Sequence, residues 1–170
     1  MGDTQYTTAM KTNATALANY FISLAKRDDK ELYQLGLMKR VYIAHGFCLA
    51  LYDRPALDGR FDKVEAWKNG PVIPSVYHSF KYHRNQPIRE ESVISNWAGD
   101  KMVFETPELK DKMVKEVADF VWERYDGMSD FQMVALTHKK GTPWALCYIE
   151  GENNPIPDLY TKSYYIMLVK

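Results

Sequence analysis

Hydrophobic side chains recur at helical spacing along most of the chain. Leu17, Phe21 and Leu24 follow an i, i+4, i+7 pattern, which predicts a helix from about residue 13 to residue 29. Between residues 30 and 52, two apolar stripes lie on neighbouring faces of a second predicted helix. A helix with two such faces is buried on most sides, so this one is expected at the centre of the fold.

The pattern changes between residues 55 and 75, where prolines and glycines interrupt any helix. Within this stretch, residues 63–67 alternate between polar and apolar side chains, as half-buried strands do. Residues 101–105 alternate in the same way. We therefore predict a β ribbon in which these two segments pair and pack on the helices.

Helical patterns return on both sides of residues 101–105. Ser75 is predicted to cap a helix that reaches residue 83. Thr106-Pro107 reads as the cap and first residue of a helix that ends at Gly127. Two further helices are predicted at residues 143–148 and 159–169.

Ser129 and Gln132 have the spacing of a capping box, in which each side chain bonds a free backbone amide of the other residue. They predict the start of a helix that runs to about residue 138. One face of that helix carries Phe131, Val134, Ala135 and His138.

Together these segments predict a mainly α fold, a compact single-domain helical structure with a small two-stranded β ribbon. The domain is expected to span residues 13–170, and residues 1–12 are expected to form a flexible N-terminal tail. A chain of 170 residues has about the length of one domain. It can bury a sizeable core without a disulfide or a metal ion.

Composition narrows the classes of partner. The 22 basic and 22 acidic side chains give a formal net charge of zero, and affinity for nucleic acid comes mainly from excess Lys and Arg. Nucleic acid is therefore not the expected partner, although the loose basic cluster at residues 81–89 leaves a local contact open. The N-terminus is polar, and no apolar stretch approaches the roughly 20 residues of a membrane span. We expect a cytoplasmic protein with no membrane partner.

The candidates for chemistry are few. His45 and Cys48 lie at i and i+3 on a predicted helix, where they could ligate a metal ion together with His138 and Cys147. His45 and Cys48 could also form a nucleophilic pair, which requires an accessible thiol of lowered pKa. Cys48 falls on an apolar stripe, so a buried core residue is the favoured interpretation. We predict no catalytic, cofactor or metal site, and His138 is expected to bind free carbonyls at its helix end.

Three stretches of the sequence resemble the Panacea antitoxin-domain family, also described as SocA-like or phage-associated. The most specific stretch is residues 65–77, with the sequence EAWKNGPVIPSVY. A helical segment at residues 37–52 precedes it, and Leu136-Thr137-His138 with Pro143-Trp144 follows it. The order and spacing of these stretches extend the resemblance over roughly residues 14–168.

This resemblance implies an antitoxin of a toxin–antitoxin system. Such a protein neutralises a cognate toxin, in many systems one that blocks translation, by direct protein–protein binding without catalysis or a cofactor. A phage-encoded or prophage-encoded inhibitor of a host defence protein on the same scaffold is the alternative. Assembly into a homo-oligomer also stays open.

Eight positions carry the family motif. They are Trp67, Gly70, Pro71, Pro74, Tyr77, His138, Pro143 and Trp144. Glycine admits backbone angles closed to other residues and proline stiffens a turn, so the favoured interpretation is a fold-defining corner. In that interpretation Trp67 buries its ring against the long helix and Tyr77 points back toward it. Direct contact with the toxin is the alternative.

Overall fold

The computed structural model describes residues 13–170, and the tail predicted at residues 1–12 lies outside the described residues. The described residues form a mainly α fold, as predicted. Its α-helices are α1 (Asn13–Arg27), α2 (Gln34–Tyr52), α3 (Pro74–Phe80), α4 (Lys112–Arg124), α5 (Asp130–His138), α6 (Pro143–Cys147) and α7 (Asp158–Val169), with a 3-10 turn at Lys81–His83. The strands are β1 (Glu65–Trp67), β2 (Gly70–Val72), β3 (Ile94–Ala98), β4 (Lys101–Glu105) and β5 (Asn154–Pro155).

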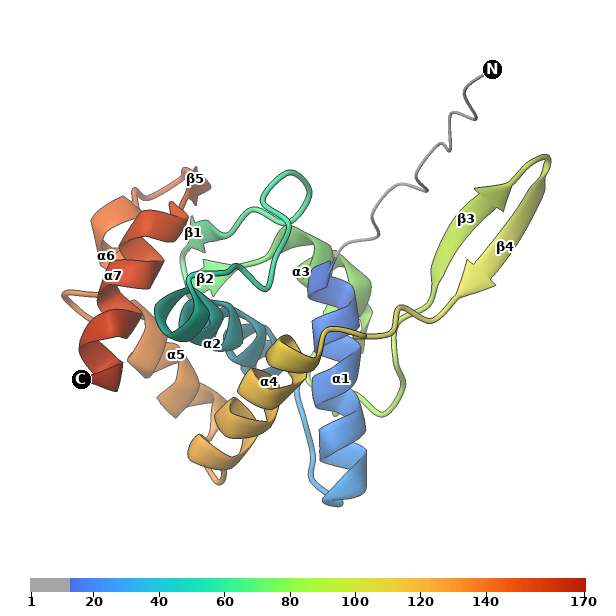
Figure 1. Cartoon of the computed structure of the whole chain (residues 1–170), viewed down its shortest axis with the longest axis horizontal. Helices are drawn as coiled ribbons and strands as arrows, with labels where there is room; N and C mark the ends of the chain where they lie inside the picture. Colours follow the sequence, from blue (N-terminus) through green and yellow to red (C-terminus); the bar gives the residue numbers. More distant parts are fainter. Residues whose placement is uncertain (1–12) are drawn as a thin grey trace.

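Helix α2 lies at the centre of the molecule, between α1 on one side and α7 on the other (Figure 1). Every residue from Gly36 to Leu49 is buried, which confirms the prediction from its two apolar stripes. The helix begins at Gln34 rather than near residue 30. The carboxyl of Asp130 accepts a hydrogen bond from the Gly36 amide, so another helix supplies the cap of α2.

The predicted pairing of residues 63–67 with 101–105 is wrong. Strand β1 instead pairs antiparallel with β2 on one side and with β5 on the other, and β3 pairs antiparallel with β4. The turns explain the difference. Lys68-Asn69 joins β1 to β2 and Gly99-Asp100 joins β3 to β4, so a two-residue turn closes each local pair. Closing such a short loop costs less conformational entropy than joining segments over thirty residues apart.

Two predicted helix starts are also wrong. Helix α4 begins at Lys112 and not at Thr106-Pro107, because the Asp111 carboxylate accepts the amides of Met113 and Val114 at 3.0 and 3.3 Å. Helix α3 has Pro74 at its first position. The Ser75 hydroxyl donates to Asp62 over 2.6 Å and does not cap the helix.

Other local signals hold. Ser129 and Gln132 form the predicted capping box of α5, and Thr142 caps α6. However, the face of α5 that carries Phe131 is not the face packed on the core. Met133 is buried on the face that packs against the core, whereas the Phe131 side chain is 86% exposed.

Candidate functional site

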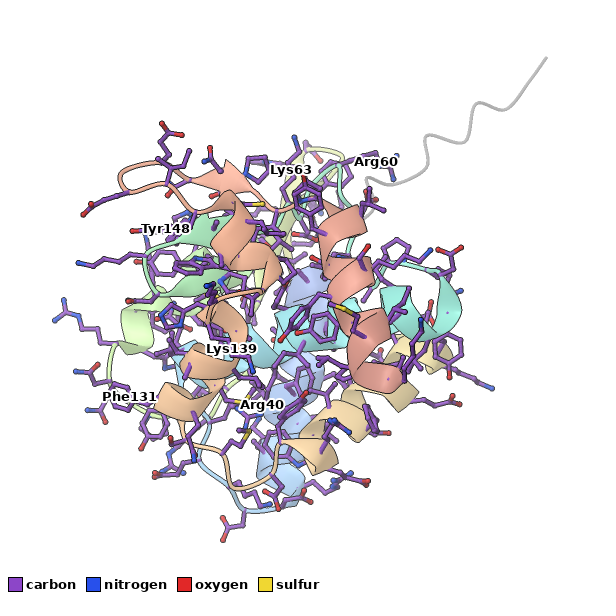
Figure 2. All side chains as sticks on the ribbon, turned by 90° about the vertical axis from the view of Figure 1, so that its left-hand side faces the viewer. Arg40, Arg60, Lys63, Phe131, Lys139 and Tyr148 are labelled. Atoms are coloured by element: carbon purple, nitrogen blue, oxygen red, sulfur yellow. The ribbon has the colours of Figure 1, made fainter. Side chains whose placement is uncertain are left out.

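The eight family-motif residues lie on the β1–β2 hairpin, α3, α5 and α6; the hairpin packs on α5, α5 packs on α6, and Tyr77 of α3 contacts Trp67. We call this region the motif corner. Pro71 and Pro143 are buried, and the aromatic side chains of the corner are half-buried. Figure 2 shows the surface beside it, with Lys139 at the end of α5 and Tyr148 next to the strands.

The hairpin turn requires glycine at position 70. Gly70 has a φ of +105°, which side chains rarely adopt, and it pairs with Trp67 across the turn. A Cβ atom here would lie 2.9 Å from the Lys39 Nζ and 3.4 Å from the Thr137 Oγ1. The backbone angle therefore disfavours a larger residue, and an added Cβ would also require the buried Lys39 side chain to shift.

Lys39 of α2 lies directly beneath this turn. Its side chain is fully buried, and its Nζ donates to the Pro71 carbonyl oxygen over 2.8 Å. No ion pair to Lys39 occurs within residues 13–170, and burial lowers the pKa of its amino group to about 7. The central helix thus holds the hairpin through a nearly dehydrated lysine.

A chain of aromatic contacts joins the two halves of the corner. The rings of Trp67 and Tyr77 meet edge-on at 5.0 Å between centroids. The Trp144 indole donates to the Trp67 carbonyl oxygen over 2.7 Å and stacks on Tyr148 at 4.6 Å. His138 packs edge-on against Trp144 at 4.9 Å. Segments about seventy residues apart are therefore locked to one another.

The contacts in the corner differ from those expected. The ring contact of Trp67 is with Tyr77 of α3, and the long helix reaches the corner through Lys39. His138 Nδ1 donates to the Val134 carbonyl oxygen over 2.7 Å, in the last turn of α5. A carbonyl can only accept, so this ring nitrogen carries the proton.

Two polar residues of the region were missed by sequence reasoning. Lys39 lies on the third face of α2, outside both apolar stripes, so the spacing gave no signal that its side chain would be buried. Asp62 is also buried, and it accepts the Ser75 hydroxyl and the Ala14 amide. Burial raises the pKa of the Asp62 carboxyl. Its position in an irregular segment gave no periodic signal.

The candidates for chemistry are not assembled into one site. Cys48 is fully buried, and burial raises the pKa of its thiol to about 12, the reverse of what a nucleophile needs. The His45 Nε2 lies 2.9 Å from an Asp158 carboxylate oxygen. Within residues 13–170, no group of three or more His, Cys, Asp or Glu side chains is placed to hold a metal ion. No helix among these residues is long and apolar enough to cross a membrane.

The fold and the corner define a mainly α domain built around one buried helix and an aromatic corner. The chain belongs to the family described as "Antitoxin SocA-like, Panacea domain", whose sequence profile matches residues 37–145. All eight motif residues fall within that match. The chain is also similar to the protein named Antitoxin SocA of Caulobacter vibrioides (strain NA1000 / CB15N), with 34% identity over 137 residues. That alignment covers 78% of this chain and 68% of the relative. No solved structure matches the chain.

Proposed function

We propose that this protein is an antitoxin that neutralises a cognate protein toxin by binding it directly. The observation that carries the proposal is the family match over residues 37–145, together with the 34% identical relative named as an antitoxin. The motif residues fit this role as scaffold, since their hydrogen bonds and ring contacts are spent within the chain.

Neutralisation by binding needs a rigid surface and apolar anchors rather than titrating groups. The buried thiol of Cys48 and the fully enclosed Lys39 support a mechanism without catalysis. A cytoplasmic location is part of the same proposal, because a toxin made in the cytoplasm must be met there. A block of translation is the activity that we propose for the toxin.

Growth after co-expression tests the proposal. The small protein encoded next to this chain is induced alone, with the wild-type chain, and with a chain interrupted by an early stop codon. We expect arrest in the first and third cultures and growth in the second. Loss of amino-acid incorporation on induction would mark translation as the target.

The alternative function makes a different prediction. An inhibitor of a host defence protein does not need a toxic neighbour, so the neighbouring protein would be harmless when induced alone. That result would overturn the antitoxin proposal. Arrest that the wild-type chain fails to relieve would overturn it as well.

A further inference from the structure

The β3–β4 hairpin projects from the helical body (Figure 1). Its cross-strand pairs run from Ile94 with Glu105 to Ala98 with Lys101. The two strands pack chiefly on each other and make no extensive contact with any other element of residues 13–170. A lone two-stranded hairpin is only marginally stable in water, so a partner that covers it would stabilise it.

One face of the hairpin is apolar. Strand alternation places Trp97 and Met102 opposite each other on this face, with Phe104 beside them. Val93, just before β3, continues the same alternation. These side chains are 55% (Val93), 69% (Trp97), 50% (Met102) and 70% (Phe104) exposed. A contiguous exposed patch of this kind is typical of an interaction site.

Acidic side chains outnumber basic ones in the segment that carries this apolar face. Residues 90–108 contain one basic residue, Lys101, whereas the whole chain has zero net charge. The acidic residues of this segment are Glu90, Glu91, Asp100, Glu105 and Glu108, of which Glu105 pairs with Ile94 on the opposite face of the ribbon. A hollow of about 410 Å³ at the base of the hairpin is lined in part by Tyr20 and Glu91. The hairpin region therefore presents an apolar strip, a net negative charge and an adjoining hollow to a partner.

Charge selects between two classes of occupant. A second copy of the chain would bring two acidic segments together, and like charges across an interface cost affinity. The hairpin face alone also falls short of the roughly 800 Å² per partner that a stable interface needs, since a buried aromatic contributes about 150–250 Å². A different protein with a basic surface avoids this repulsion, and it can extend the contact into the hollow beside the hairpin.

We propose that the apolar face of the β3–β4 hairpin docks the toxin, and that the toxin meets it with an apolar patch bordered by Lys and Arg. This inference rests on the proposed antitoxin function. Trp97 and Phe104 are the anchors, because large aromatic side chains dominate the energetics of protein interfaces. The carboxylates of residues 90–108 steer the encounter and make it sensitive to salt.

The test uses the purified neighbouring protein as the probe and isothermal calorimetry as the readout. Two variants, Trp97→Ala and Phe104→Ala, remove the anchors, and the double variant Glu90→Lys/Glu108→Lys reverses part of the negative charge. Phe131→Ala is the matched control, because Phe131 is an exposed aromatic on the face seen in Figure 2, which looks at the side away from the hairpin. Circular dichroism confirms that each variant is folded.

Each anchor variant is expected to weaken binding by at least about 30-fold, the threshold of an interface hot spot. The charge variant should lose at least about tenfold at low salt and show a smaller salt dependence, while the control binds as the wild type does. The charge variant keeps the anchors, so it decides the question even if an anchor variant fails to fold.

Other outcomes overturn the inference. Unchanged binding in the anchor and charge variants would refute it while leaving the antitoxin function intact, provided that the wild type still rescues growth. Light scattering that shows a dimer of the free chain, dissociated by Trp97→Ala, would assign the face to a second copy. Failure of the wild-type chain to rescue growth would instead refute the antitoxin function itself.

Discussion

Replacing Lys39 by methionine tests how the central helix holds the motif corner. The Lys39 side chain is fully buried, and burial lowers the pKa of its amino group from its ordinary value to about 7, because it penalises the charged form. In the unfolded chain the amine is solvated and its pKa is near 10.4. At pH 7 this difference corresponds to roughly 4 kcal/mol of lost stability, since one pKa unit is worth about 1.4 kcal/mol.

The sign of the pH dependence follows from proton counts. The folded-state pKa of Lys39 is the lower one, so the unfolded chain binds more protons between pH 7 and about 10.5. The free energy of unfolding therefore rises with pH in that window, by about 1.5 kcal/mol from pH 7.0 to 8.5. Burial raises the pKa values of Cys48 and Tyr42, which oppose the rise above about pH 8.5.

Urea unfolding followed by circular dichroism at pH 7.0 and 8.5 measures this dependence. Lys39→Met should lose the rise and should be about 1–3 kcal/mol more stable than the wild type at pH 7. That gain is the ionisation penalty less the roughly 1–3 kcal/mol cost of leaving the Pro71 carbonyl without a donor. Lys68→Met, at an exposed position of the same hairpin turn, is the control and should keep the wild-type rise. An equal rise in Lys39→Met would refute the reasoning.

Three further changes test the corner and the core. Gly70→Ala should lower the stability by more than about 2 kcal/mol, because it combines a positive φ with a crowded Cβ position. Gly127→Ala, at a positive φ with open space, is the control and should lower it by about 1 kcal/mol. Equal losses of stability in thermal unfolding would contradict the steric argument. Trp144→Phe removes the hydrogen bond to the Trp67 carbonyl and should lower the free energy of unfolding by about 1 kcal/mol in urea unfolding. An unchanged free energy would show that this hydrogen bond does not stabilise the fold. Cys147→Ser leaves Cys48 as the remaining thiol. Ellman's reagent should not modify Cys48 in the native variant and should modify it once denaturant is added.

The periodic signals gave the helical part of the fold. Two stripes on residues 30–52 located the buried central helix, and the capping box at Ser129 located the start of α5. The helix start was predictable because the capping contacts lie within one turn, and the central helix because its stripes repeat over several turns. The resemblance likewise selected Trp67 and Trp144, which the structure joins by a hydrogen bond.

The strand pairing could not be read from alternation. Alternation shows that a segment has two faces, but it does not name the neighbour, and residues 63–67 and 101–105 were paired on pattern alone. The strand added from residues 154–155 has no pattern of its own, since its two residues lie in a segment that reads as a loop. The cap of α4 was missed because Asp111 competes with Thr106 as a start signal.

The pattern of apolar positions also did not predict which helix faces are exposed, for a different reason. Helical spacing groups Phe131 with its neighbours but does not decide whether that face meets the core, which depends on the position of α2. The buried Lys39 is a similar case, because only the assembled fold shows that the turn at Gly70 closes over it.

The pairing of Ala66 with Asn154 sets the order in which a newly made chain can mature. The ribosome releases the hairpin first and adds the missing strand roughly 90 residues later, after about 5–18 s of synthesis. Helix α7, which covers α2, emerges later still. Until then, the nascent chain exposes an unpaired strand edge and an apolar helix to chaperones and proteases. The central helix is fully covered only once α7 has left the ribosome and packed on α2.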